Sequence, residues 1–265
     1  MADGDAKFQL SAAQLRDVRD LWFEHLTSSE DFVLPRQKQN ERWFVGSEAF
    51  DHICVERFAA ILEGIRKSNI KTGTDILEVA KPDDPLDWLS LVILLDQIPR
   101  NCYRGDAAAV AFTFFDPIAY EVARAAIERG LPEVNPQLRW QLAYRQWFYL
   151  PFMHSEDLGE HTLALRAYDK MRKDVYTLAE EIYDAEPLEP LQGYEQPDYR
   201  ARAAKVVRAN AERYCLIMDR KVLMEKKHMD IIKRFGRYPH RNKAMRRIST
   251  AEETEYLENG GETFG

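Results

Sequence analysis

The sequence lacks any long hydrophobic run: the longest nearly apolar stretch, LSLVILL at 89–95, is too short to cross a bilayer. The first ten residues, MADGDAKFQL, have neither the basic nor the apolar region of a secretion signal. Cysteine is scarce, and its three residues have no spacing typical of disulfide frameworks or zinc sites. A glycine-rich phosphate loop is also missing. We therefore expect a soluble, cytoplasmic protein with no metal or cofactor and no ATP-dependent activation step.

Strand-like alternation is absent too, whereas helical spacing of apolar residues recurs along the chain. Ser11 and Ser47 are in position to cap the first two predicted helices. Pro85 suits the first turn of a third helix, and Pro99 ends it. Further helices are predicted over 106–115, 117–129, 136–147 and 155–183. The pattern predicts an all-α fold in which an antiparallel helical array forms a bundle or solenoid.

One stretch interrupts this pattern. The segment 184–198 holds three prolines, one glycine and five acids, and is expected to be an acidic, proline-rich loop. After it, 199–235 contains no proline or glycine and is predicted to be one long, basic, amphipathic helix. We expect residues 1–265 to form a single helical domain.

Charge is unevenly distributed. Residues 200–247 contain sixteen Lys or Arg and four acids, a local net charge of +12 within a chain of net charge −7. Such asymmetry indicates either a polyanionic partner or a solvated helix face balanced by acidic neighbours.

The first polar motif is DQIPRNCYRG at 96–105, which places Asp96, Arg100 and Arg104 around a predicted helix end. Asp96 follows an apolar stretch, where an unpaired carboxylate is costly to bury. It is either half of a structural ion pair with Arg100 or a substrate-binding carboxylate with arginines nearby for an anionic group. Cys102 is better explained by packing than by nucleophilic catalysis.

The second motif is FYLPFMHSEDL at 148–158. Ser155 and Asp157 are typical of a helix N-terminus. His154 and Glu156 have no such explanation, and a histidine beside a carboxylate can act as a general base at neutral pH.

The third motif lies in the basic region. His228 falls on the apolar face of the predicted long helix, as expected of a core histidine. The turn that follows gathers four bulky donors in GRYPHRN at 236–242: Arg237, His240, Arg241 and Asn242. Thr250 and Glu253 have the spacing of a capping box.

Together, LLDQIPRNCYRG, LPFMHSEDL, RFGRYPHRN and STAEETEYLENGGETF resemble the domain-of-unknown-function 924 family over roughly residues 20–263, with a tail like that of its fungal branch. The resemblance implies a tetratricopeptide-like helical fold. Two departures from the family pattern are Met245-Arg246-Arg247, where Leu-Gly-Arg is usual, and Cys102, where an aliphatic residue is common. The chain is also similar to the small fungal arginine-containing cyclodipeptide synthases, which use aminoacyl-tRNA.

This resemblance implies an aminoacyl-tRNA-dependent, amide-bond-forming enzyme. Asp96 and Glu156 are candidates to bind a substrate guanidinium, and His154 or His240 to take the proton from the attacking amine. The oxyanion of the tetrahedral intermediate, or the terminal adenosine of the tRNA, is expected to be held by Arg237, Arg241 and Asn242. Arg100, Arg104 and His228 complete the substrate-binding set. The residues expected to bind tRNA on one exposed face are Arg208, Arg220, Lys221, Lys226, Lys227 and Lys233.

Two other interpretations remain open. The same polar cleft suits a hydrolase or transferase acting on a small phosphorylated or carboxylated metabolite. Alternatively, the motifs hold helix ends together in a non-catalytic scaffold that binds a protein partner.

Overall fold

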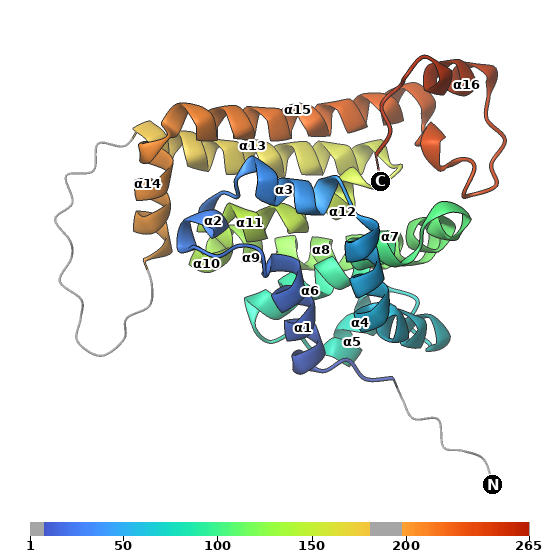
Figure 1. Cartoon of the computed structure of the whole chain (residues 1–265), viewed down its shortest axis with the longest axis horizontal. Helices are drawn as coiled ribbons and strands as arrows, with labels where there is room; N and C mark the ends of the chain where they lie inside the picture. The colour runs from blue at the N-terminus through green and yellow to red at the C-terminus, as the bar shows by residue number, and fades with distance from the viewer. Residues whose placement is uncertain (1–7, 181–197, 265) are drawn as a thin grey trace, which may run out of the picture.

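The computed structural model describes residues 8–180 and 198–264, and every regular element within these ranges is a helix. The predicted all-α, antiparallel helical array is confirmed (Figure 1). The longer elements are α1 (Ala12–Phe23), α4 (Glu48–Lys67), α6 (Pro85–Asp96), α8 (Asp116–Glu128), α13 (Leu158–Glu180), α14 (Tyr199–Ala209) and α15 (Ala211–Phe235). The shorter ones are α2 (Ser29–Val33), α3 (Gln37–Phe44), α5 (Gly73–Ala80), α7 (Ile98–Cys102), η1 (Gly105–Ala108), η2 (Ala111–Phe115), α9 (Leu131–Val134), α10 (Pro136–Trp140), α11 (Leu142–Arg145), η3 (Gln146–Phe148), α12 (Leu150–Met153), η4 (Pro239–Arg241) and α16 (Ala251–Glu258).

Helix starts follow the local signals in most cases. The side chains of Ser11 and Ser47 accept hydrogen bonds from the backbone N–H groups of the first turns of α1 and α4. Pro85 occupies the first turn of α6. The expected cap at Ser155 is wrong, because the Asp157 carboxylate accepts the Gly159 N–H at 2.6 Å and α13 begins one residue after Asp157.

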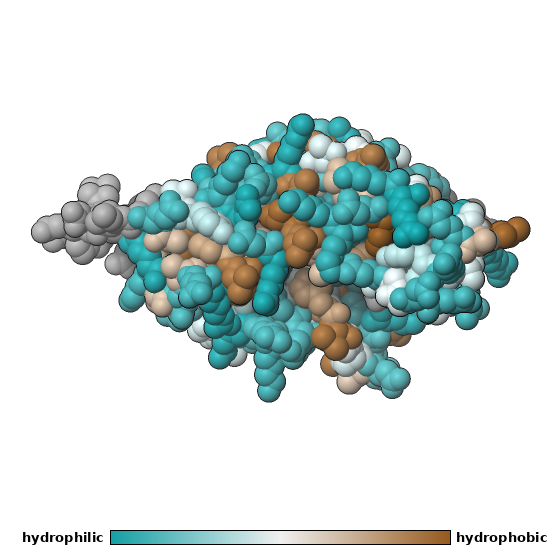
Figure 2. Space-filling view, turned by 90° about the horizontal axis from the view of Figure 1, so that it is seen from above, coloured by the Kyte–Doolittle hydropathy of each residue, from teal (hydrophilic) through white to brown (hydrophobic). Residues whose placement is uncertain are grey.

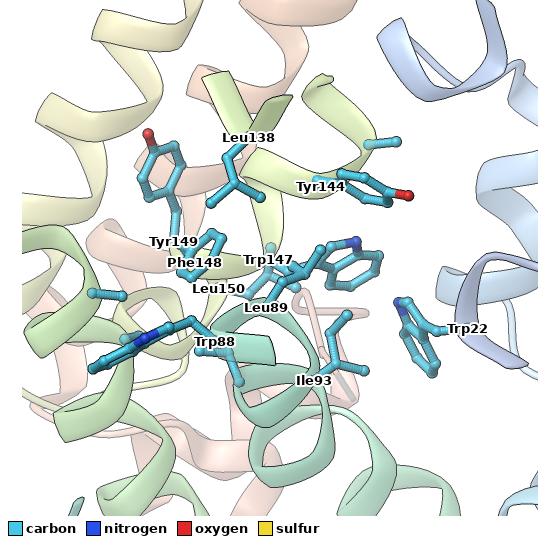
Figure 3. Close-up of a cluster of buried hydrophobic side chains, with 14 of the residues drawn as sticks. Trp22, Trp88, Leu89, Ile93, Leu138, Tyr144, Trp147, Phe148, Tyr149 and Leu150 are labelled. Atoms are coloured by element: carbon cyan, nitrogen blue, oxygen red, sulfur yellow. The ribbon is translucent and has the colours of Figure 1, made fainter. Parts of the chain in front are cut away.

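The core is built around α6, which is buried from Trp88 to its last residue. Aromatic rings from distant segments surround it (Figure 3). Trp147 lies edge-on to Trp22, with ring centroids 5.2 Å apart, and edge-on to Trp43, at 5.0 Å. Because α6 has apolar neighbours on all sides, it ends inside the molecule, and its final residue, Asp96, is a carboxylate with no exposure.

α13 and α15 pack along each other in opposite directions at one side of the molecule (Figure 1). Tyr176 of α13 donates to Asp219 of α15 at 2.8 Å. Nearer the start of α13, His161 contacts Glu225 at 2.8 Å, and both side chains are fully buried. This pairing brings the end of α15 next to the α12–α13 connection, which carries the second sequence motif.

The prediction of one helix over 199–235 is wrong, because the helix is interrupted at Asn210, between α14 and α15. Its backbone leaves the helical region, with φ −148° and ψ 48°, and its carbonyl accepts the N–H of Tyr214. Asparagine favours such breaks since its side chain competes for backbone hydrogen bonds. Of the acidic segment 184–198, only Asp198 is among the described residues, and it caps α14.

Two further predicted helices differ. The range 106–115 forms the short turns η1 and η2, and 136–147 is divided among α10, α11 and η3. Residues 140–147 of the second range are all buried, whereas only Ala111 and Phe115 are buried in the first.

The segment after α15 forms a small second cluster in which Tyr238 packs with Ile231 and Ile232. The side chain of Thr250 accepts the N–H of Glu253 and caps α16, as predicted. Within the described ranges, the helices are either too short or too polar to span a membrane.

Candidate active site

The end of α6 and the α12–α13 connection meet through Asp96 and His154. The Oδ1 atom of Asp96 lies 2.7 Å from Nδ1 of His154. Gln97 donates to the other carboxylate oxygen. The histidine side chain keeps 13% of its surface exposed. Its Nε2 atom makes no hydrogen bond to any described residue, so it is available to a bound molecule.

The protonation states of this pair follow from burial and neighbouring charge. Burial lowers the pKa of His154, and the Arg100 cation lowers it further, against the opposing effect of Asp96. Burial raises the pKa of Asp96, but the facing His154 and Arg100 outweigh it and leave the pKa below its ordinary value. The pair is therefore an aspartate and a neutral imidazole at pH 7. The Nδ1–H group donates to the carboxylate, and the Nε2 lone pair is free to accept a proton.

Two arginines and a second carboxylate lie beside the pair. Arg100 binds Asp116 through two hydrogen bonds, of 2.7 and 3.1 Å, and lies 3.8 Å from Asp96. Arg241 donates from Nη1 to the His154 carbonyl at 2.9 Å. The rings of Phe112 and Tyr238 hold its guanidinium, at 4.6 and 4.5 Å from the ring centroids. Burial lowers the pKa of Arg241, although guanidinium remains charged at any physiological pH.

Four of these residues, Phe112, Asp116, His154 and Arg241, border a cavity of about 280 Å³, the first pocket. It is lined by Phe112, Asp116, Pro117, Tyr120, Pro151, His154, Ser155, Glu156, Arg241 and Met245. The predicted candidates His154, Glu156 and Arg241 therefore share one cavity. Asp96 lies behind the wall and reaches the cavity only through His154, so its predicted role as a guanidinium-binding carboxylate is wrong.

Glu156 anchors the segment that follows α15. Its carboxylate accepts two hydrogen bonds from Arg247, of 2.6 and 3.0 Å, and one from the N–H of Tyr238 at 2.9 Å. Burial raises its pKa, but these hydrogen bonds and the Arg247 charge reverse the shift, so the carboxyl is ionised. The geometry makes Glu156 a wall residue that holds η4 over the pocket rather than a free acid or base.

A second pocket of about 290 Å³ adjoins the first. It is lined by Arg100, Tyr103, Arg104, Gly105, Ala108, Ala111, Phe112, His240, Ala244, Thr263 and Phe264, and shares Phe112 with the first. Arg104 is held by Asp51 at 2.8 and 2.9 Å. Burial and the Arg241 charge lower the pKa of His240 to about 4, against the carbonyl of Phe264. His240 is therefore a neutral group of the second pocket, not of the first.

Three other candidates line neither pocket. Arg237 donates to both oxygens of Glu253 at 2.6 and 2.7 Å, and Asn242 donates to the same carboxylate at 3.2 Å. Both residues flank η4 and bind Glu253 of α16, so neither lies in the wall of a pocket where an oxyanion or a terminal adenosine was expected. His228 is 4% exposed, and its ring stacks on that of Phe264 with centroids 3.6 Å apart. It is a core residue, as its place on the apolar face of the helix predicted. Its position does not suit the substrate-binding role also expected of it.

Cys102 is unsuited to nucleophilic catalysis, since burial raises the pKa of its thiol to about 12. Among the residues that the structure describes, no three His, Cys, Asp or Glu side chains are grouped as metal ligands.

The predicted tRNA-binding residues do not share one exposed face. Arg220, Lys226 and Lys233 are exposed. Lys227 pairs with Glu262, and Arg208 donates to the Leu178 carbonyl at 3.1 Å. The exposed assignment of Lys221 is wrong: its Nζ binds Gln146 Oε1 at 2.6 Å, and burial lowers its pKa to about 8. Figure 2 shows the side formed by α15, where hydrophilic side chains dominate and apolar patches interrupt them.

Sequence reasoning missed four residues of the site: Phe112, Asp116, Tyr238 and Arg247. Asp116 precedes a proline at the start of α8, which reads as an ordinary helix N-terminus. Arg247 matches the arginine of the usual Leu-Gly-Arg pattern, and only the fold reveals its pairing with Glu156. Tyr238 lies inside the GRYPHRN turn, and the concentration of polar residues in that turn was the only sequence signal that could have pointed to it.

The family described as "Bacterial protein of unknown function (DUF924)" matches residues 18–261, a range that includes every residue lining the first pocket. A similar solved structure is "Structure of Protein of Unknown Function ATU0120 from Agrobacterium tumefaciens". The two chains are 30% identical, with a TM-score of 0.54, over 94% of this chain and 99% of the other. No curated protein matches this chain.

Proposed function

The chain belongs to this family of proteins of unknown function, DUF924, and we propose that it is an acyl-transfer enzyme with Asp96 and His154 as its general-base pair. One observation carries the proposal: a buried aspartate fixes one nitrogen of a neutral histidine, while the other nitrogen is available to a pocket. A general base needs a proton-free nitrogen within reach of the nucleophile and a partner that holds its tautomer.

In the proposed reaction, Nε2 of His154 accepts a proton from a substrate amine as the amine nitrogen attacks an ester carbonyl carbon. Asp96 stabilises the imidazolium that forms. The carbonyl oxygen gains the negative charge, and the nearby Arg241 guanidinium stabilises it. The ester C–O bond then breaks, and the imidazolium returns the proton to the departing alcohol oxygen, which leaves an amide and a neutral histidine.

We assign the ester to aminoacyl-tRNA, which makes the enzyme an aminoacyl-tRNA-dependent transferase, with cyclodipeptide synthesis as its specific form. The local charge of +12 over 200–247 and the exposed Arg220, Lys226 and Lys233 support a polyanionic substrate. The first pocket is lined by the carboxylates of Asp116 and Glu156 and by the Arg241 guanidinium, groups of both signs that suit a substrate with a cationic amine or guanidinium beside a polar carbonyl.

Three experiments test this function. Extracts of cells that express the chain are compared by mass spectrometry with extracts of cells that carry an empty vector, and we expect a new amide product. In vitro, the product should form from charged tRNA without ATP and stop after ribonuclease treatment. The His154→Gln variant, folded as the wild type by circular dichroism, should lose about 10²–10⁴-fold in rate. A His154→Gln variant with wild-type rate contradicts the proposal.

The volume of the first pocket favours a second candidate, hydrolysis of a small ester. At about 280 Å³ the cavity lies at the lower end of the range for small-molecule sites. Water would then replace the amine as the nucleophile that His154 deprotonates. Activity on a small ester that survives ribonuclease treatment would assign this function in place of transfer from tRNA.

A further inference from the structure

The two adjoining pockets differ in charge. The first is lined by the carboxylates of Asp116 and Glu156 as well as by one arginine. The second is lined by Arg100 and Arg104, and none of the described residues that line it is an acid. Asp116 and Asp51, which pair with these arginines, are outside its lining, so the second cavity presents cations and the first presents both signs. A ligand that spans both is therefore expected to carry its anionic group in the second pocket.

Aromatic rings and small side chains form the rest of the second pocket. Tyr103, Phe112 and Phe264 contribute rings to its wall. His240 adds a neutral imidazole, and Phe264 lies edge-on to it, with centroids 6.3 Å apart. Both ring nitrogens of His240 are buried, and neither forms a well-aligned hydrogen bond with a described residue. The aromatic rings of this wall suit stacking by a flat ring system.

Arg104 has capacity left for an anion. Asp51 occupies its Nε and Nη2 atoms, which leaves Nη1 without a hydrogen bond to any described residue. Its side chain retains 45% of its surface exposed, so the free end reaches solvent at the pocket. A phosphate would form a charge-assisted hydrogen bond there.

We propose that the second pocket binds a nucleoside phosphate: the terminal nucleotide of the acyl donor, with its base against the aromatic wall and its phosphate at Arg104. This inference rests on the proposed function, and it names the part of the donor that the protein holds. The shared Phe112 places that nucleotide beside the first pocket, where His154 is available to the amine that attacks the ester.

Adenosine 5′-phosphate is the probe, and isothermal titration calorimetry on the full chain is the measurement. Ala108→Phe fills the second pocket, since Ala108 lines it. Ala107→Phe is the matched control, because the neighbouring Ala107 is exposed and does not line it. We expect the first variant to weaken binding at least tenfold and the second to leave it unchanged. Equal binding by the two variants, or no saturable binding to the wild type at millimolar concentrations, overturns the proposal.

A second variant keeps the test independent of how well Ala108→Phe folds. Arg104→Gln changes an exposed side chain, and we expect it to weaken adenosine 5′-phosphate about tenfold while leaving adenosine unchanged. Equal loss for both ligands, or inorganic phosphate binding as tightly as the nucleotide, overturns the assignment. The His154→Gln variant should bind the probe as the wild type does, so loss of turnover there and loss of the nucleotide site are separate results.

Discussion

The Asp96→Asn substitution removes one charge from the centre of the site and little volume. Asp96 has no exposed surface, and it accepts hydrogen bonds from His154 at 2.7 Å and from Gln97. In the variant, an amide replaces the carboxylate. Either its oxygen still faces Nδ1–H of His154, or its NH₂ group does and forces the proton onto Nε2. In both arrangements the imidazolium loses its stabilising anion, and Arg100 keeps only Asp116 as a close counter-charge.

The size of the effect follows from these contacts. A hydrogen bond to a buried charge contributes about 1.5–3 kcal/mol to stability. We expect the free energy of unfolding to fall by about 2 kcal/mol, which for a chain of this size lowers the Tm by about 4–8 °C. Loss of an oriented general base lowers the rate about 10²–10⁴-fold. The His154 pKa should fall further below its ordinary value, because the carboxylate that raised it is gone.

Calorimetry gives the Tm, NMR gives the titration of His154, and product formation gives the rate. Asp106→Asn serves as the control, since Asp106 is an exposed acid of η1 outside both pockets. The reasoning fails if Asp96→Asn keeps the wild-type rate, or if the pKa of His154 rises in the variant.

Three further predictions concern other parts of the structure. Burial lowers the pKa of His228 to about 3 and of His240 to about 4, so the unfolded chain binds protons first. The contribution of these two histidines to the free energy of unfolding should therefore be full above about pH 6.5 and fall as pH drops toward 4, by at most about 1.4 kcal/mol per pH unit per histidine. Urea unfolding at pH 7.5 and 5.5 measures this loss. Replacing both histidines with glutamine should reduce the difference in unfolding free energy between those two pH values. Glu253→Gln weakens the contacts from Arg237 and Asn242 that fasten α16, so amide hydrogen exchange should become faster over 236–258 but not in α6. Unchanged exchange over 236–258 would contradict this role of Glu253. Charge reversal at Lys226 and Lys233 should lower tRNA affinity and reduce the salt slope by about one unit per lost phosphate contact, whereas an unchanged slope indicates a solvated helix face.

Much of the fold was predictable because its signals are local. The caps at Ser11, Ser47 and Thr250 depend on a side chain and a backbone group three residues apart. The break at Asn210 was missed because helical spacing continues on both sides of it. The position of α14 against α2 and α10, and of α15 against α13, depends on contacts that no local pattern records.

The site was predictable in its residue types but not in its pairings. His154 stood out because the helix N-terminus predicted from Ser155 and Asp157 gave it no structural role. The expected ion pair of Asp96 with Arg100 is present at 3.8 Å, but the closer contacts, of Asp96 to His154 and of Arg100 to Asp116, were not predicted. Such partners lie on different helices and far apart in the chain. The spacing of residues within one segment does not show which side chain of another segment will face it. For the same reason, the division into two pockets at Phe112 needed the fold.

The pH dependence of amide formation from charged tRNA, measured for the wild type and for His154→Gln, tests the central claim most directly. Because burial lowers the pKa of His154, the wild-type rate should rise with pH through a midpoint below 6.5 and then level off. The variant should be at least about 10²-fold slower and should lose that acidic limb. A variant that keeps both the wild-type rate and the limb would show that His154 is not the base.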